Sequence, residues 1–175
     1  MLPTEWCKRA LQFDPVLVVA TERGTADAIA QLLRGFGAAP RLIWSGAEAD
    51  CWRRFEVSRP KLIFMEQAGR AIDGLALTKK LRRSPFACCS SPVVMLSNER
   101  TVTALRDAQN AGASEFLTRP FSTEDLARRL EAVCRVSRDW IEAETYVGPD
   151  RRRFDSAAKG PERRGRKREI LQLLA

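Results

Sequence analysis

The chain has 175 residues, 45% of them hydrophobic, which suits one domain with a sizeable core and an appendage. No apolar run reaches the roughly 18 residues of a membrane-spanning helix and no secretory leader pattern is present, so we expect a cytoplasmic protein without a transmembrane segment. The five cysteines lack CxxC spacing and histidine is absent, which argues against a zinc site and against a histidine base. We therefore predict no metal, no cofactor, no catalytic residues and no enzyme activity.

Short apolar runs alternate with amphipathic stretches after an N-terminal extension, residues 1–14, which is compatible with a short helix. Runs that are apolar almost throughout are typical of strands buried on both faces of a parallel sheet. The predicted strands are 15–20, 41–44, 61–65, 92–96 and 114–118.

The stretches between these strands have apolar residues at helical spacing. Residues 25–37 place four apolar side chains on one face, Ile29, Leu32, Leu33 and Phe36, and 75–83 and 102–112 behave likewise. Ser122 is a predicted N-cap for the last long helix. Five βα units predict an α/β fold with a doubly wound, five-stranded parallel sheet, in which ligands bind beyond the carboxyl ends of the strands.

Three stretches carry a resemblance to a known family: PKLIFMEQAGRAIDG, PVVMLS and GASEFLTRPFS. With the sheet pattern, they make residues 15–136 similar to the CheY-like receiver domains of bacterial response regulators, and we assign 15–143 to such a domain. The resemblance implies a flavodoxin-like (βα)5 fold. It also implies signalling through an aspartate that ends the third strand and accepts a phosphoryl group beside magnesium.

The residues at the family's phosphorylation site depart from that pattern. Glu66 stands at the phosphoacceptor position, and Ala20 and Thr21 replace the acidic pair that helps to hold magnesium, with only Glu22 nearby. Magnesium needs a compact octahedron of oxygens. The departures predict a pseudo-receiver that is not phosphorylated.

Three further positions belong to this comparison. Arg119 replaces the family's lysine, Ser97 keeps the hydroxyl position, and Phe116 keeps the aromatic position on a face, 102–121 and the helix that follows, where receivers meet partners. A Glu66–Arg119 pair has two interpretations: a lasting imitation of phosphorylation, or a salt bridge that fills an abandoned pocket.

The C-terminal tail, residues 144–175, repeats a motif: GPDRR at 148–152 returns as GPERR at 160–164. From Val147 onward there are nine Lys/Arg and four Asp/Glu, so most of the net charge of +8 lies here and predicts an anionic partner. An arginine fork fits guanine O6 and N7. An adjacent carboxylate can accept from guanine N1 and N2, whereas it would repel a phosphate backbone. The acids in the repeat therefore favour a guanine ligand such as c-di-GMP.

The tail also resembles the arginine-rich extension of the Cle-type CheY-like proteins of alphaproteobacteria. That resemblance implies c-di-GMP binding and a protein partner such as the flagellar motor switch or a histidine kinase. The residues carried over by motif position are Asp150, Arg151, Arg152 and Arg153 from the first copy, and Glu162, Arg163 and Arg164 from the second.

Three functions follow from these residues. The first is a non-enzymatic effector, a pseudo-receiver whose tail binds c-di-GMP and which recognises no specific nucleic acid. The second is a phosphoacceptor in a two-component phosphorelay. The third is an adaptor whose basic tail binds nucleic acid or an anionic membrane with steep salt dependence. We expect the tail between Gly148-Pro149 and Gly160-Pro161 to lack regular structure on its own, because it is polar and has little to bury.

Overall fold

Five parallel strands form the central sheet of the computed structural model, which describes residues 13–135 and 139–151. The strands are β1 (Val16–Val19), β2 (Leu42–Ser45), β3 (Leu62–Glu66), β6 (Val93–Ser97) and β7 (Glu115–Thr118). Their order is β2-β1-β3-β6-β7, which confirms the predicted doubly wound sheet. Each strand lies within one or two residues of its predicted range.

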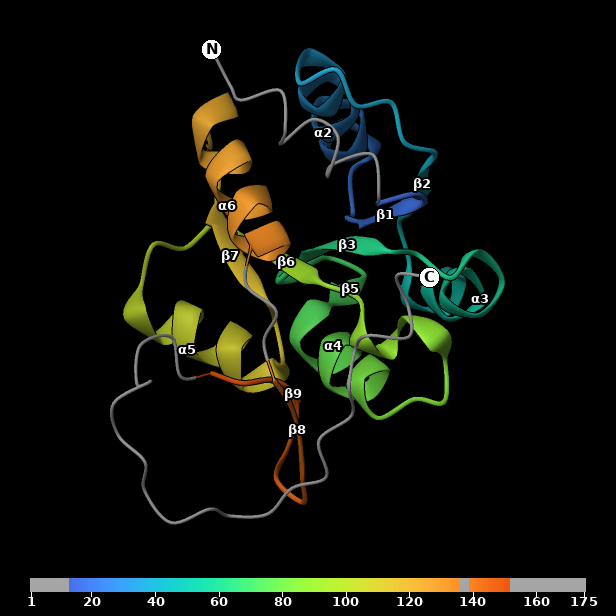
Figure 1. Ribbon diagram of the computed structural model, residues 1–175, viewed down its shortest axis with the longest axis vertical. Helices are drawn as coiled ribbons and strands as arrows, with labels where there is room; N and C mark the ends of the chain where they lie inside the picture. Colours follow the sequence, from blue (N-terminus) through green and yellow to red (C-terminus); the bar gives the residue numbers. More distant parts are fainter. Residues whose placement is uncertain (1–12, 136–138, 152–175) are drawn as a thin grey trace.

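The strands are buried because helices cover both faces of the sheet (Figure 1). Every residue of β1, β3 and β6 is buried, as their continuous apolar runs predict. The helices are α2 (Arg23–Gly35), α3 (Glu48–Ser58), α4 (Gly74–Arg82), α5 (Val102–Ala111) and α6 (Thr123–Arg135).

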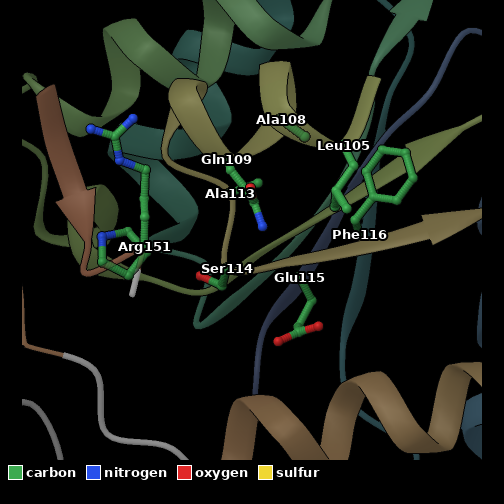
Figure 2. Close-up of a pocket in the computed structure, with 9 residues that line it drawn as sticks. Leu105, Ala108, Gln109, Ala113, Ser114, Glu115, Phe116 and Arg151 are labelled. Carbon is green, nitrogen blue, oxygen red and sulfur yellow. The ribbon is translucent and has the colours of Figure 1, made fainter. Parts of the chain in front are cut away.

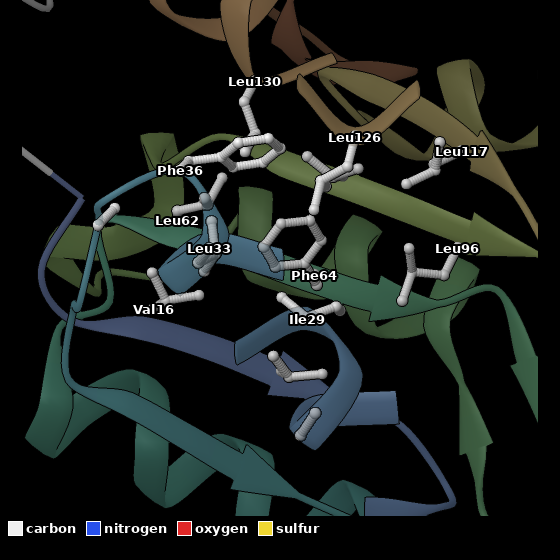
Figure 3. Close-up of a cluster of buried hydrophobic side chains, with 14 of the residues drawn as sticks. Val16, Ile29, Leu33, Phe36, Leu62, Phe64, Leu96, Leu117, Leu126 and Leu130 are labelled. Carbon is white, nitrogen blue, oxygen red and sulfur yellow. The ribbon is translucent and has the colours of Figure 1, made fainter. Parts of the chain in front are cut away.

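Helices α2 and α6 lie on one face, and their apolar stripes form the first core cluster with the sheet. Ile29 and Leu33 of α2 meet Leu126 and Leu130 of α6 over Phe64 of β3 (Figure 3). The second cluster lies on the opposite face, under α3, α4 and α5. It includes two buried cysteines, and burial raises the pKa of Cys51 to about 11 and that of Cys88 to about 12. These thiols stay protonated at neutral pH and are therefore unreactive.

The helix ends follow the local sequence. The Ser122 hydroxyl accepts from the Asp125 amide at 3.1 Å, which confirms the predicted N-cap. Helix α5 ends at Gly112, whose φ of 97° favours glycine.

A β-hairpin follows α6 and was not predicted. Strands β8 (Trp140–Ala143) and β9 (Tyr146–Pro149) pair antiparallel across a two-residue turn. The hairpin overlaps the first residues assigned to the tail, whereas most of the stretch expected to lack regular structure lies outside the described residues. Gly148 and Pro149 suggest a helix break in the sequence, but burial against α4 and α5 turns them into a strand (Figure 1).

A smaller hairpin, β4 (Ala68–Gly69) with β5 (Ile72–Asp73), follows β3 and was also not predicted. The predicted N-terminal helix lies outside the described residues. Within the part of the chain that the structure describes, no helix is long and apolar enough to cross a bilayer.

Candidate functional site

Three of the predicted pocket residues meet at the carboxyl end of the sheet. Thr21 follows β1, Glu66 ends β3, and Arg119 follows β7. Because the strands are parallel, these positions share one edge.

Both oxygens of the Glu66 carboxylate are engaged. Oε2 accepts from the Thr21 amide at 2.7 Å, and Oε1 accepts from Arg119 Nη2 at 2.6 Å. The Glu66 side chain is 8% exposed and that of Arg119 is 23% exposed, so this ion pair is more sheltered from water than an ordinary surface pair.

The contacts of Glu66 set its charge. Burial alone would raise its pKa, but the hydrogen bond from Thr21 and the guanidinium of Arg119 outweigh burial and hold the pKa below its usual 4.5. The carboxylate is therefore ionised at neutral pH and already has a cation beside it.

Gly69 of β4 closes the pocket over this pair. A Cβ at Gly69 would lie 2.6 Å from Glu66 Oε2 and would also collide with Thr21 Oγ1, so a larger residue here would force one of these two side chains to shift. Thr21 Oγ1 and Arg119 Nε are buried without a hydrogen-bond partner among the described residues. Glu66, one methylene longer than the family's aspartate, places its carboxylate between Thr21, Gly69 and Arg119.

Ala20 is buried at the end of β1, and Trp44 of β2 lies against it. The indole Nε1 donates to the Ala20 carbonyl at 3.0 Å, and the Arg23 guanidinium lies 5.9 Å from the Trp44 ring. Sequence reasoning assigned Trp44 only to a strand. The sequence offered one signal for this role: Trp44 ends the predicted strand 41–44, and Ala20 stands where the family has an acidic residue.

Among the described residues, the side chains of the other predicted pocket positions make no hydrogen bond to this ion pair, although the Arg119 amide donates to the Ser97 carbonyl at 2.7 Å. The Ser97 hydroxyl accepts from the Glu99 amide at 3.0 Å, within its own loop. Glu22 is exposed and is the N-cap residue of α2, without a side-chain capping bond. Phe116 is half-buried and packs against the second core cluster.

A second group of polar contacts lies at the amino end of the sheet, where the hairpin docks. Arg82 of α4 is 2% exposed and donates to the carbonyls of Gly112 at 2.9 Å, Cys89 at 2.6 Å and Ser91 at 2.7 Å. Its guanidinium lies 5.3 Å from the Trp140 ring. Burial lowers the pKa of Arg82 to about 10, so it remains charged at neutral pH. Trp140 is 5% exposed and is thus a packing residue.

The hairpin fixes the first arginine of the repeated motif. The Arg151 guanidinium lies 4.1 Å from the Tyr146 ring and donates from Nη1 to Asn110 Oδ1. The amide of Asp150 donates to the Asp139 carbonyl at 2.8 Å. Gly148 permits this docking, because a Cβ there would lie 2.7 Å from the Tyr146 hydroxyl. The other predicted ligand contacts, Arg152, Arg153, Glu162, Arg163 and Arg164, lie outside the described residues.

A shallow hollow runs beside Arg151, between α5 and β7 (Figure 2). Arg151 lies at one end of it, Gln109 and Ser114 lie in the middle, and Leu105 and Phe116 lie at the other end. Its cavity volume is about 10 Å³, which holds about one water molecule.

The family model of the response regulator receiver domain matches residues 16–131. The chain belongs to the response regulator receiver family. The match covers the sheet, helices α2 to α5 and most of α6 and ends before the hairpin, so the hairpin and the tail lie beyond the family match.

Curated relatives and solved receivers agree with this assignment. The chain is 29% identical over 124 residues to the sensory transduction protein RegX3 of Mycolicibacterium smegmatis, covering 71% of this chain and 52% of the relative. It is 25% identical over 132 residues to the response regulator MprA of Mycobacterium avium, covering 75% and 56%. The chain therefore spans about half the length of these relatives.

Two solved structures show the same fold. The chemotaxis protein CheY4 of Vibrio cholerae aligns with a TM-score of 0.61 at 19% identity, covering 69% of this chain and 98% of that one. The signal receiver domain from Bermanella marisrubri aligns with a TM-score of 0.59 at 21% identity, covering 67% and 95%.

A receiver's magnesium would need oxygen ligands at the carboxyl end of the sheet, and the residues here do not fit that ion. Ala20 offers no side-chain oxygen, and Glu66 is already bound to Arg119 and Thr21. Within residues 13–135 and 139–151, no group of three His, Cys, Asp or Glu could hold a metal. An octahedral site cannot be assembled from these donors without breaking the Glu66–Arg119 pair.

Proposed function

We propose that this protein is a pseudo-receiver effector: its receiver pocket is locked, and its arginine-rich tail binds c-di-GMP and regulates a protein partner. The partner would be of the kind that receivers meet in signalling, such as a flagellar motor switch or a histidine kinase. The observation that carries the proposal is the docking of Arg151, the first arginine of the repeat, on the receiver body.

The pocket supports the loss of phosphorylation. An incoming phosphoryl group would need the space that Glu66 fills. It would also need a free carboxylate oxygen, and both oxygens of Glu66 already accept from Thr21 and Arg119. Phosphoryl transfer depends on positioned cations around the transferred group, and the Arg119 guanidinium is already paired with Glu66. The same ion pair leaves both interpretations of Glu66 open, since an arginine–carboxylate contact either imitates the phosphorylated state or merely fills the pocket.

The docked motif supports a guanine ligand. An arginine fork reads guanine O6 and N7 with two parallel hydrogen bonds, and a carboxylate from Asp150 or Glu162 would accept from N1 and N2. Arg151 is exposed, and its guanidinium can be approached from solvent. A tail that served only as an electrostatic arm would gain nothing from an arginine fixed against Tyr146.

Calorimetric titration of c-di-GMP into the full chain tests this proposal. We expect micromolar or tighter binding that Arg152→Ala/Arg164→Ala abolishes and that c-di-AMP does not reproduce, because adenine lacks O6. Lys159→Ala, which removes one charge outside both motifs, is the matched control and should change affinity less than about threefold.

The basic-arm alternative gives a different result in the same titration. Binding to nucleic acid or anionic vesicles would fall by orders of magnitude between low and moderate salt, and Asp150→Ala would strengthen it. Tighter binding of c-di-GMP to Asp150→Ala would refute the guanine-edge interpretation.

The phosphoacceptor alternative is tested with acetyl phosphate and magnesium. We expect no acyl phosphate on the wild-type chain or on Glu66→Asp alone, since the carboxylates that hold magnesium are still missing. Restoring the family pattern with Ala20→Asp, Thr21→Asp, Glu66→Asp and Arg119→Lys should allow phosphorylation, detected by intact mass. Phosphorylation of the wild-type chain would overturn the pseudo-receiver assignment.

A further inference from the structure

The Arg151 guanidinium is the outer layer of a stack that the receiver body supports. Its Cζ atom lies over the Tyr146 ring, 4.1 Å from the ring centroid. Tyr146 is 4% exposed and its hydroxyl donates to the Pro149 carbonyl at 2.6 Å, so the ring beneath Arg151 is fixed. Asn110, at the end of α5, holds the edge of the same guanidinium. The plane of this exposed arginine is therefore set before any ligand arrives.

The hollow beside this stack cannot enclose a ligand. At about 10 Å³ it holds about one water molecule, whereas pockets for small molecules are roughly 300–1,000 Å³. A ligand must lie on the surface here, and a flat base gains most by stacking on a planar cation. Gln109 and Ser114 lie along the hollow from Arg151 and offer an amide and a hydroxyl to such a base (Figure 2).

We propose that a guanine base of the ligand stacks on the outer face of Arg151, forming a Tyr146–Arg151–guanine stack beside Asn110 and Gln109. The nucleotide site is then shared between the tail and the receiver body. This inference rests on the proposed function and adds a location, because it puts the ligand on the α5–β7 side of the receiver, next to the predicted partner face that contains Phe116.

A shared site links ligand binding to the folding of the receiver. A ligand that contacts only the tail binds the folded and unfolded chain alike and leaves the melting temperature unchanged. A ligand that needs Tyr146 and Asn110 in place binds the folded state better and stabilises it.

Thermal unfolding of the full chain with and without saturating c-di-GMP makes this distinction. For a tenfold preference for the folded state we expect the melting temperature to rise by about 5 °C. c-di-AMP at the same concentration is the control. Calorimetric binding without any rise would overturn the shared site.

Affinity measurements on two asparagine variants give a second readout. Asn110→Ala releases Arg151 from its fixed orientation, and we expect c-di-GMP affinity to fall about three- to tenfold. Asn98→Ala, at an exposed asparagine beyond the carboxyl end of β6, is the matched control and should bind like the wild type. Unchanged affinity in Asn110→Ala would overturn the shared site, and tighter binding would show that the docked arginine opposes the ligand.

The two proposals fail in different ways. If the wild-type chain binds no c-di-GMP, the proposed function itself is wrong. If the wild type binds, but without stabilisation and with Asn110→Ala equal to it, only the shared site is wrong.

Discussion

Two largely buried arginines lie at opposite ends of the sheet, and their charges are compensated in different ways. At the carboxyl end, Arg119 pairs with Glu66 at 2.6 Å. At the amino end, Arg82 donates to three backbone carbonyls and lies against Trp140. The first arrangement occupies a pocket that the family uses for chemistry, and the second holds a hairpin that lies beyond the family match.

The two arginines differ in the groups that compensate their charge. Arg119 depends on an ionised partner, so its contact is sensitive to pH. Arg82 depends on carbonyls and a ring, which do not titrate, so its contact depends on the position of the hairpin. An ion pair holds Glu66 and Arg119 together at the carboxyl end of the sheet, while packing against Arg82 positions the hairpin at the amino end.

Arg82→Leu should have the largest effect on stability. It leaves three carbonyls without their donor and removes the cation next to Trp140, and we expect a loss on the order of 4 kcal/mol in the free energy of unfolding. Urea denaturation measures this loss, and tryptophan emission reports whether the hairpin detaches. Arg83→Leu, at an exposed neighbour that donates only to the Glu144 carbonyl, should cost less than about 0.5 kcal/mol.

Glu66→Ala should have the next largest effect. It leaves the Arg119 guanidinium and the Thr21 amide without their acceptor, at a cost of about 2–3 kcal/mol, moderated because Arg119 is partly exposed. The single variant Arg119→Ala and the double variant Glu66→Ala/Arg119→Ala complete a double-mutant cycle, in which the double variant should lose less stability than the two single losses added together. Losses that simply add in the double variant would show that the pair is not coupled.

Gly148→Ala tests the docking of the hairpin. The added Cβ would lie 2.7 Å from the Tyr146 hydroxyl and 3.1 Å from the Gly112 Cα, and we expect a loss of about 1–3 kcal/mol. Gly24→Ala is the matched control: nothing lies within 4 Å and the residue is helical, so stability should rise by about 0.5 kcal/mol. A tolerated Gly148→Ala would contradict the close contact.

The smallest effect is the pH dependence of the Glu66 contact. The pKa of Glu66 is lower in the folded protein than its usual 4.5, so its stabilising contribution is complete above about pH 4.5 and is lost as the pH falls through the folded value. The difference in urea midpoint between wild type and Glu66→Gln should therefore be constant near neutral pH and shrink below pH 4.5. A difference that grows on acidification would reverse the sign of this linkage.

The sheet could be predicted because its strands are buried on both faces and carry unbroken apolar runs, as β1 and β3 do. The pocket positions could be predicted because the ends of parallel strands meet at one edge, which brought Thr21, Glu66 and Arg119 together.

The hairpin was missed because its strands are only four residues long and carry Gly148 and Pro149, which indicate a break when no neighbour is known. What makes it a hairpin is contact with Arg82 and Gly112, residues distant in the sequence. The roles of Trp44 and Asn110 were missed for the same reason, since each depends on a partner that only the fold supplies.

Two glycines let the hairpin lie close to the end of α5. A Cβ on Gly148 would lie 3.1 Å from the Gly112 Cα, and a Cβ on Gly112 would lie 3.0 Å from the Val147 carbonyl oxygen and 2.9 Å from Arg82 Cγ. Enlarging either glycine would therefore push the hairpin or the Arg82 side chain away from its place. Receivers that carry this docked hairpin should therefore be identifiable by a glycine after the fourth receiver helix together with Trp-x5-Tyr-x-Gly-Pro after the fifth and an arginine equivalent to Arg82.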